Sequence, residues 1–446
     1  MIIKEIDQGH DGNDKFNYVY ATNDPTNKKA YQYQLPSIKS IFLSTFLPAG
    51  YPNSVRPEYL SYQAWDSIQC ISSSIRSVMT TKGLLQKAGV GSAEASALSA
   101  AIIFSCNDGI GMIGSLSFAY VYSNNFEVYA KEWRLFADVL NNVALSLDLI
   151  IPLLPSTYYI FLTSLSTLSK ACCGLIAGAT KARISAHFAH KGHLAEVTAK
   201  ESTQETGVGL IGLVFGVMIS SIVGKDDRFE ICIFIFIGLL LLHQVANYML
   251  MKTLIFDVLN PQRLYLIVEI FFHRDSNNVK EISIIEKIRP KSIALLETLY
   301  HPFYLGYCGP VIGNSVTSII ECIDIVNKKY NENYSLDQLY QICADKKYII
   351  GLTKHYRVVV CLGLGCNETD TIKGYIASTY LTFYFKKHKV NNIMIALRMM
   401  ILENALKNAM DKADKCFQLI SDSESWDIDD NKTRLGEGTY RYTIND

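Results

Sequence analysis

The chain has 446 residues, enough for two or three domains, and its 42 Lys+Arg balance its 42 Asp+Glu. Without net positive charge it has no field that attracts nucleic acid, so nucleic acid is excluded as an expected partner. Only 19% of the residues are charged, against about 25% in an average domain, and 49% are hydrophobic, which favours a membrane protein. The eleven cysteines include no CxxC pair, which favours reduced thiols over a disulfide framework.

Residues 1–35 mix Asp, Asn, Lys and Tyr without a helical or strand period, and they are predicted to form a disordered tail. Their acidic content is atypical of signal and transit peptides, so the organelle stays unknown. The apolar run Ile38–Leu47 then ends at a turn that contains Pro48 and Pro52. Apolar residues at helical spacing follow from Tyr59 to Leu85, which we interpret as a helix that docks before the membrane.

Five stretches of low charge follow, and a helix needs about 20 apolar residues to cross a membrane. They are Ala97–Tyr122, Val139–Pro155, Tyr158–Thr180, Thr206–Val223 and Ile231–Met251. The last has no formal charge in 21 residues, and a polar turn joins it to the stretch before, so these two are predicted to form a helical hairpin in lipid. The other three each carry one charge. Buried helices of a water-soluble protein are the alternative for all five.

The chain becomes polar after about residue 260 and contains two short β-branched runs, Tyr348–Leu352 and Tyr356–Leu362, before a predicted helix. The predicted fold class is therefore mostly α, with a polytopic transmembrane helical region followed by a small soluble α/β domain. The expected domains are a tail at 1–35, a membrane domain at 36–260 with about 3–5 transmembrane helices, a helical connector at 261–330, the α/β domain at 331–421 and a polar tail at 422–446.

One glycine-rich motif has the spelling of a dinucleotide fingerprint, GxGxxG at 207–212. A helical, charged run precedes it where the fingerprint needs a strand, so no cofactor is expected. Gly209, Gly212 and Gly216 are instead interpreted as small residues that let two helices pack closely.

The histidines at 187, 190 and 193 lie near several glutamates, but a spacing of three drifts around a helix and Gly192 interrupts it, so no metal is expected. No Ser/His/Asp set, P-loop or paired carboxylates with a defined neighbourhood occur, and no catalytic residue is proposed. The sequence favours a non-enzymatic protein.

Asp108 lies in the middle of an apolar stretch of 26 residues, where a carboxylate is costly in lipid and marks a candidate site. Gly109 and Gly111 beside it permit close backbone approach or a broken helix, as at substrate sites of transporters. The alternative is a buried soluble helix in which Asp108 caps a turn.

Several ordered blocks of residues resemble the root UVB sensitive family. They are Phe46-Leu-Pro-Ala-Gly-Tyr-Pro-Asn-Ser-Val55, Trp65-Asp66, Ser74-Ile-Arg76, Asn107-Asp-Gly-Ile-Gly111, Trp133-Arg-Leu-Phe-Ala-Asp138, His187-Phe-Ala189 and Ala199-Lys-Glu-Ser-Thr-Gln-Glu-Thr206. The resemblance covers about residues 36–260 most fully. It implies a membrane-associated protein with a link to vitamin B6 homeostasis, and it implies no established enzymatic reaction.

Residues and resemblance together suggest a charged face that carries the family signature. Its candidate residues are Asp66, Arg76, Trp133, Arg134, Asp138, Lys200, Gln204 and Glu205. The leading hypothesis is an integral membrane protein that carries or gates a small polar solute. The alternatives are a membrane-anchored module that pairs with the same or another family member, and an unrecognised enzyme of vitamin B6 metabolism. The expected partners are membrane lipid and such family members, and the small-molecule ligand is unknown.

Overall fold

The computed structural model describes most of the chain in two compact units. The described residues are 2–8, 14–20, 38–87, 97–190, 193–223, 229–275, 282–299, 310–331, 333–343, 346–353, 357–387, 399–428, 435 and 440–443. Residues Met1–Tyr120 and Trp133–Leu254 form the first, which we call the helical unit. Residues Val121–Glu132 and Ile255–Asp446 form the second, which we call the mixed unit.

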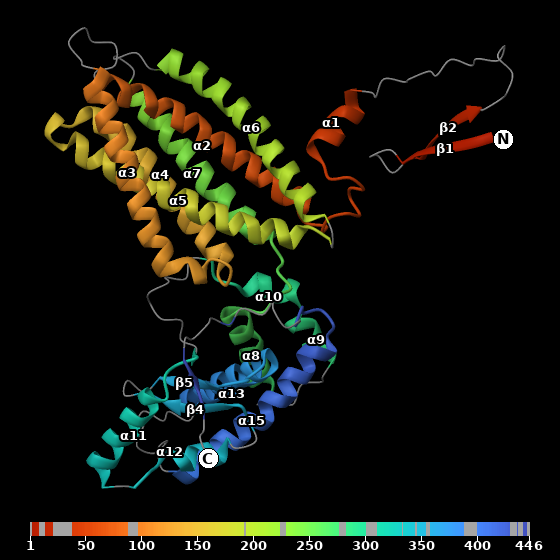
Figure 1. Cartoon of the computed structure of the whole chain (residues 1–446), viewed down its shortest axis with the longest axis vertical. Helices are drawn as coiled ribbons and strands as arrows, with labels where there is room; N and C mark the ends of the chain where they lie inside the picture. Colours follow the sequence, from red (N-terminus) through yellow and green to blue (C-terminus); the bar gives the residue numbers. More distant parts are fainter. Residues whose placement is uncertain are drawn as a thin grey trace. The chain divides into compact units, whose positions relative to one another are not determined.

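Long helices make up the helical unit (Figure 1). They are α2 (Tyr59–Lys87), α3 (Ala97–Tyr122), α4 (Ala130–Ile150), α5 (Tyr159–Phe188), α6 (Leu194–Val223) and α7 (Phe229–Thr253), preceded by the short α1 (Ile38–Phe46). By length and composition, five segments could cross a membrane: Ala101–Asn125, Ala130–Leu153, Tyr159–Phe188, Leu194–Ile222 and Glu230–Thr253. The sequence predicted apolar helices in all five places, and the structure confirms them.

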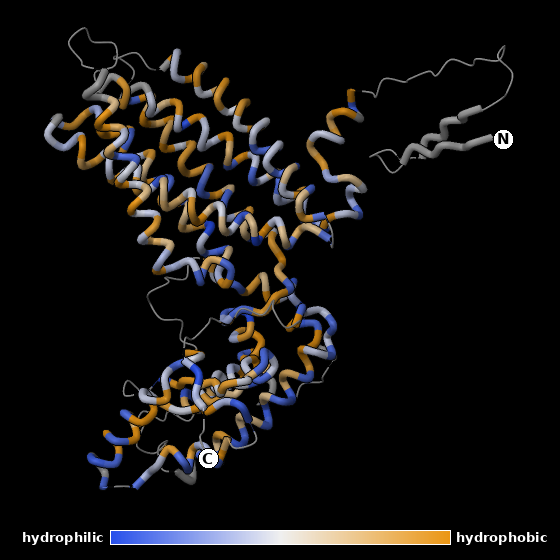
Figure 2. Tube along the Cα trace, in the orientation of Figure 1, coloured by the Kyte–Doolittle hydropathy of each residue, from blue (hydrophilic) through white to orange (hydrophobic). Residues whose placement is uncertain are grey.

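The apolar side chains of these helices point largely outward. Only 11% of the most apolar window is buried in α3 and in α6, and large residues such as Leu116, Phe215 and Phe234 are at least half exposed. Figure 2 shows hydrophobic residues predominating along the helical unit and alternating with hydrophilic ones in the mixed unit. An apolar surface of this extent is suited to contact with lipid or with another protein.

Helix α2 differs from the expectation of a docking helix before the membrane. It packs against both α6 and α7, and therefore lies inside the bundle (Figure 1). Gly212 and Gly216 of α6 make this packing close, because a Cβ at these positions would lie 2.7 Å from the Cβ of Ser74 and 2.9 Å from that of Val78. Gly209 has open space around it and has no such role.

The N-terminal segment also differs from the expected disordered tail. Strand β1 (Ile2–Gln8) pairs antiparallel with β2 (Asp14–Tyr20), with Ile2 opposite Tyr20 and Gln8 opposite Asp14. Both strands are rich in β-branched and aromatic residues, which favour extended structure. The rest of residues 1–35 lies outside the described residues.

The mixed unit contains a small sheet with strand order β3-β5-β4, to which β6 adds beside β5. Strands β3 (Val311–Ile312) and β6 (Arg441–Tyr442) run parallel to β5 (Val358–Gly363), and β4 (Tyr348–Leu352) runs antiparallel to it. Every residue of β4 and β5 is buried, since α13 (Glu368–Lys387) packs on both strands and α11 (Thr317–Tyr330) on β4.

The expected connector at 261–330 and tail at 422–446 are parts of the mixed unit. Helix α8 (Pro261–Asp275), α9 (Ile282–Ile288) and α10 (Pro290–Leu296) share one hydrophobic core with the sheet, α12 (Leu336–Ile342) and α15 (Met399–Asp422). Trp426 is buried in this core and donates its indole N–H to the carbonyl of Ile288. Because the expected connector and the expected tail are polar overall, the few apolar residues that bind them to this core were not recognised from the sequence.

Candidate functional site

A stripe of polar side chains runs along the buried face of α2. Its members recur every three or four residues, which places them on one side of a helix. They are Gln63, Asp66, Gln69, Ser72, Arg76 and Thr80, and each is less than a tenth exposed. Because burying polar groups is costly unless they are paired, the partners of this stripe define what the bundle interior can do.

Two carboxylates flank one guanidinium at the centre of the stripe. Arg134 of α4 lies 3.7 Å from the Asp66 carboxylate through Nη2 and 3.8 Å from the Asp138 carboxylate through Nε. The three side chains are at least nine-tenths buried. Two negative charges and one positive charge leave this triad with a net charge of about −1 when all three are ionised.

Amides and one histidine complete the surroundings of Asp138. The Gln69 amide donates to Asp138 Oδ1 at 3.1 Å and lies 3.1 Å from His243 Nε2, while the Asn247 amide donates to the other oxygen of Asp138. Since Gln69 Nε2 can only donate, His243 Nε2 accepts, and the ring proton is assigned to Nδ1. His243 and Asn247 are fully buried.

The next turn of α2 carries a second group of contacts. Arg76 Nη1 donates to Asn142 Oδ1 at 2.7 Å, and Asn142 in turn donates to Gln244 Oε1 at 2.8 Å. Asn141 donates to the hydroxyl of Ser73 at 3.0 Å. We call these groups of contacts together the polar track: Asp66, Gln69, Ser73 and Arg76 of α2, Arg134, Asp138, Asn141 and Asn142 of α4, and His243, Gln244 and Asn247 of α7.

The two ends of the polar track differ in chemistry. At one end Gln63 reaches Glu201 of α6 at 3.4 Å, and Glu201 also accepts from the Ser185 hydroxyl of α5. Around Arg76, at the other end, Ile75, Met79, Leu145 and Phe236 form an apolar cluster. From Gln63 to Arg76 the stripe extends about 20 Å along the α2 axis, at about 1.5 Å a residue.

The sequence-predicted residues Asp66, Arg76, Arg134 and Asp138 therefore come together, whereas Lys200 and Gln204 contact α1, and Glu205 interacts with Asp66 and Arg134 only at longer range. Lys200 donates to the carbonyl of Ser44, and Gln204 to that of Phe46, at the C-terminal end of α1. Side-chain donors at a helix C-terminus satisfy carbonyls that have no partner within the helix.

Two further candidates have contacts of other kinds. Glu205 forms an ion pair with Lys181 at 2.6 Å. Trp133 stacks edge-on against Phe118 at 5.9 Å and Phe136 at 5.7 Å between ring centroids. These contacts are compatible with a structural role.

Asp108 is exposed on α3, away from the polar track. Its neighbour Asn107 is the buried polar residue, donating to Thr163 at 3.0 Å and accepting from Ser164 at 2.7 Å. Gly111 faces Thr167 and Ala171 of α5, while a Cβ added at Gly109 would have nothing within 4 Å of it. A one-residue step along the helix thus turns the acid outward, because successive side chains are about 100° apart.

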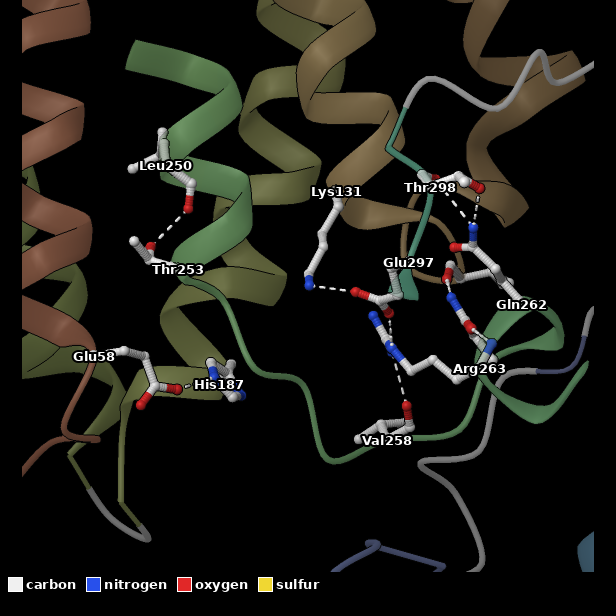
Figure 3. A network of polar contacts seen from close by, with 12 residues as sticks. Glu58, Lys131, His187, Leu250, Thr253, Val258, Gln262, Arg263, Glu297 and Thr298 are labelled. Carbon is white, nitrogen blue, oxygen red and sulfur yellow. Dashed lines mark hydrogen bonds and ion pairs between the residues drawn. The ribbon is translucent and has the colours of Figure 1, made fainter. Parts of the chain in front are cut away.

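The mixed unit contains a buried charge cluster that the sequence did not suggest. Glu297 accepts from Lys131 Nζ at 2.5 Å and from Arg263 Nε, and Arg263 also donates to the carbonyl of Val258 (Figure 3). Burial raises the pKa of Glu297, but Arg263 and Lys131 lower it by more, so that the pKa lies below its usual value.

Histidines and acids do not form a metal site in the described part of the chain, where no group of three such residues lies close enough. His187 instead binds Glu58 at 3.0 Å, and His193 lies 3.4 Å from Glu196. Burial raises the pKa of Glu58, while the hydrogen bond and charge of His187, a backbone hydrogen bond and the charge of Arg56 together lower it by more, with a net decrease.

Gln69, Asn142, His243, Gln244 and Asn247 were not predicted as site residues. Two signals in the sequence could have found them: the three-and-four spacing of polar residues in α2, and the three polar residues of α7 within an otherwise apolar helix. Which helices these residues connect could not be read from either signal.

Residues 33–275 match the family model described as a vitamin B6 photo-protection and homoeostasis domain. The chain is 35% identical over 251 residues to RUS family member 1 of Dictyostelium discoideum, a match that covers 56% of this chain and 48% of that protein. It is 28% identical over 350 residues to Protein root UVB sensitive 3 of Arabidopsis thaliana, covering 77% and 76% of the two chains.

A third relative is Protein root UVB sensitive 2, chloroplastic, of Arabidopsis thaliana, 30% identical over 233 residues, which are 52% of each chain. The matches thus span about half the length of two of these three curated relatives. No solved structure matches the chain. The matched region contains every residue of the polar track.

Proposed function

The chain belongs to the root UVB sensitive family, and from this premise we propose that its helical unit is embedded in a membrane and carries a small polar solute linked to vitamin B6 homeostasis. The mixed unit then forms a water-soluble α/β domain attached to it. Five apolar helices with outward-facing apolar side chains support the first part of the proposal.

The observation that carries the proposal is the polar track inside this apolar bundle. Ionisable groups within membrane helices are expensive, and they ordinarily line the path of a substrate or an ion. Here two arginines, two aspartates and a histidine lie at most about a tenth exposed between α2, α4 and α7. The buried polar stripe of α2 from Gln63 to Arg76 extends over about 20 Å, which is about two thirds of the roughly 30 Å thickness of the hydrocarbon core of a bilayer.

Asp138 is the residue whose change should affect transport most, because it contacts Arg134, Gln69 and Asn247 together. Asp138→Asn keeps the volume and removes the charge. We expect solute flux to fall tenfold or more, since a charge-assisted hydrogen bond contributes about 1.5–3 kcal/mol. The measurement is uptake of pyridoxine and of pyridoxal 5′-phosphate into liposomes that contain the protein.

The matched control is Asp324→Asn, an exposed carboxylate of α11, which should transport like the unmodified protein. Alkaline carbonate extraction establishes that each variant is embedded before its flux is compared. Uptake no faster than into protein-free liposomes for both vitamers, with the unmodified protein embedded, would reject the carrier proposal.

A second candidate function is pairing with another copy of the chain or with a family member through α3. This helix is mostly exposed, and its Asp108 has no hydrogen bond or ion pair with any described residue. A carboxylate that faces lipid at this depth is stabilised when a polar or charged group of a second chain contacts it.

Gly109→Leu tests the pairing because Gly109 faces open space, so that the added side chain leaves the single chain undisturbed. It should block close approach of a second helix and shift the detergent-solubilised protein to a smaller mass in light scattering after size exclusion. A mass unchanged by Gly109→Leu and by Asp108→Asn would count against α3 as the contact.

A further inference from the structure

Arg76 is a fully buried cation without a carboxylate in contact. Its guanidinium donates through Nη1 to Asn142 and through Nε to the carbonyl of Ser72, and it lies 5.7 Å from the ring centre of Phe236. All three partners are uncharged. Within the described residues no carboxylate lies within the 4.0 Å of an ion pair with Arg76. An isolated charge in such surroundings is strongly disfavoured unless an opposite charge approaches it.

Two hydrogen-bond donors of the polar track have no described partner. One is Nη2 of Arg76, and the other is Nδ1 of His243, whose second nitrogen already accepts from Gln69. Leaving buried donors without an acceptor costs about 1–3 kcal/mol each, and more for a charged group. The carbonyl oxygen of Asn247 is likewise without a partner, and as an acceptor it suits a hydroxyl of a ligand.

We propose that Arg76 binds an anionic group of the solute, a carboxylate or a phosphate, at its end of the polar track. The inference rests on the proposed function, because the same track admits the solute. Arg76 presents a donor on a planar guanidinium, the group best matched to oxyanions. The apolar cluster of Ile75, Met79, Leu145 and Phe236 surrounds it, which strengthens electrostatic attraction to an oxyanion.

The other arginine of the track is a weaker candidate for this role. Arg134 already has Asp66 and Asp138 within 3.8 Å, so an entering anion would meet two negative charges there. Asp138 interacts with Arg76 only over a longer distance, and electrostatic attraction falls with separation. An oxyanion in contact with Arg76 would neutralise it more effectively.

Binding is tested on the full chain in lipid nanodiscs, with sodium phosphate or sodium acetate replacing sodium chloride at constant ionic strength. The two salts separate a phosphate from a carboxylate preference. We expect at least one of them to raise the thermal unfolding midpoint in a saturable way. Arg76→Gln should weaken this binding about tenfold to a hundredfold, from the contribution of a charged hydrogen bond.

Arg76→Lys keeps the charge and should retain part of the binding, whereas the exposed Arg289→Gln should leave it unchanged. A saturable shift of equal size in Arg76→Gln would overturn the inference, as would no shift for either anion in the unmodified protein. If Arg76→Gln does not fold, a binding constant for Arg76→Lys equal to that of the unmodified protein would overturn it.

The flux measurement separates this inference from the proposed function. Anion binding that depends on Arg76, without uptake of either vitamer, would leave the anion site standing and remove the carrier. Uptake of pyridoxine, which is neutral, without any anion effect on the unmodified protein would leave the carrier standing and remove the anion site.

Discussion

At the scale of single residues, the local sequence identified charges but not their surroundings. Asp108 lies within an apolar stretch and Asp138 directly before one, yet Asp108 is exposed and Asp138 is bound by three side chains of three helices. Lys200 was a functional candidate, and its ammonium caps the end of α1. The direction of a side chain in a bundle depends on helix rotation, which is set by packing with distant helices.

Glu297 provides a prediction for the mixed unit. Glu297→Gln removes the carboxylate that neutralises the buried Lys131 and Arg263, and we expect a loss of about 3–5 kcal/mol in the stability of this unit. Native-state hydrogen exchange of the β4 and β5 amides in the full chain measures the loss. Asp414→Asn is the control, because its carboxylate is 42% exposed and its ion pairs should contribute within about 1 kcal/mol.

The same residue predicts a pH dependence. The pKa of Glu297 is lower in the folded protein than in the unfolded chain. Its contribution to the stability of the mixed unit is therefore fully present above the ordinary glutamate pKa of about 4.3, and it is lost as the pH falls through the folded pKa. Amide exchange measured over a series of pH values should show this acid-sensitive loss of stability in the unmodified protein and not in Glu297→Gln. An identical pH profile for the two proteins would contradict the assignment.

At the scale of elements, hydropathy was sufficient to predict five long apolar helices, and spacing was sufficient to predict the helix that became α2. The position of α2 between α6 and α7 was not predicted, although Gly212 and Gly216 of α6 permit its close contact with α2. Sequence neighbours were expected to pair as a hairpin in lipid. In the structure α2 packs more extensively on α6 and on α7 than these two pack on each other.

Gly216 supplies a prediction about this packing. In Gly216→Leu the new Cβ would lie 2.9 Å from the Val78 Cβ and 3.3 Å from the Ile75 Cα, so α2 and α6 must move apart. We expect a loss of about 1–3 kcal/mol, typical of overpacking, seen as a lower thermal midpoint in detergent. Gly209→Leu is the control on the same helix, since nothing lies within 4 Å of its Cβ and leucine has the better helix propensity.

At the scale of the whole molecule, composition separated an apolar region from a more polar one, but the boundaries followed the cores. The described parts of residues 261–330 were expected to connect two domains, and they share one core with β4, β5, α13 and α15. Strand β6, near the C-terminal end, adds to the same sheet. Core membership is a property of burial, and a few apolar residues in a polar segment are enough to produce it.

The sequence by itself determined the apolar helices, the two central strands β4 and β5 and the family, because each of these depends on the order of residue types along the chain. Only the tertiary structure decided that Asp66, Arg134, Asp138 and His243 form one polar track and that Asp108 stays outside it. Contacts between residues some 70 to 180 positions apart arise from the rotation and the pairing of helices, which side-chain packing sets and local periodicity does not encode.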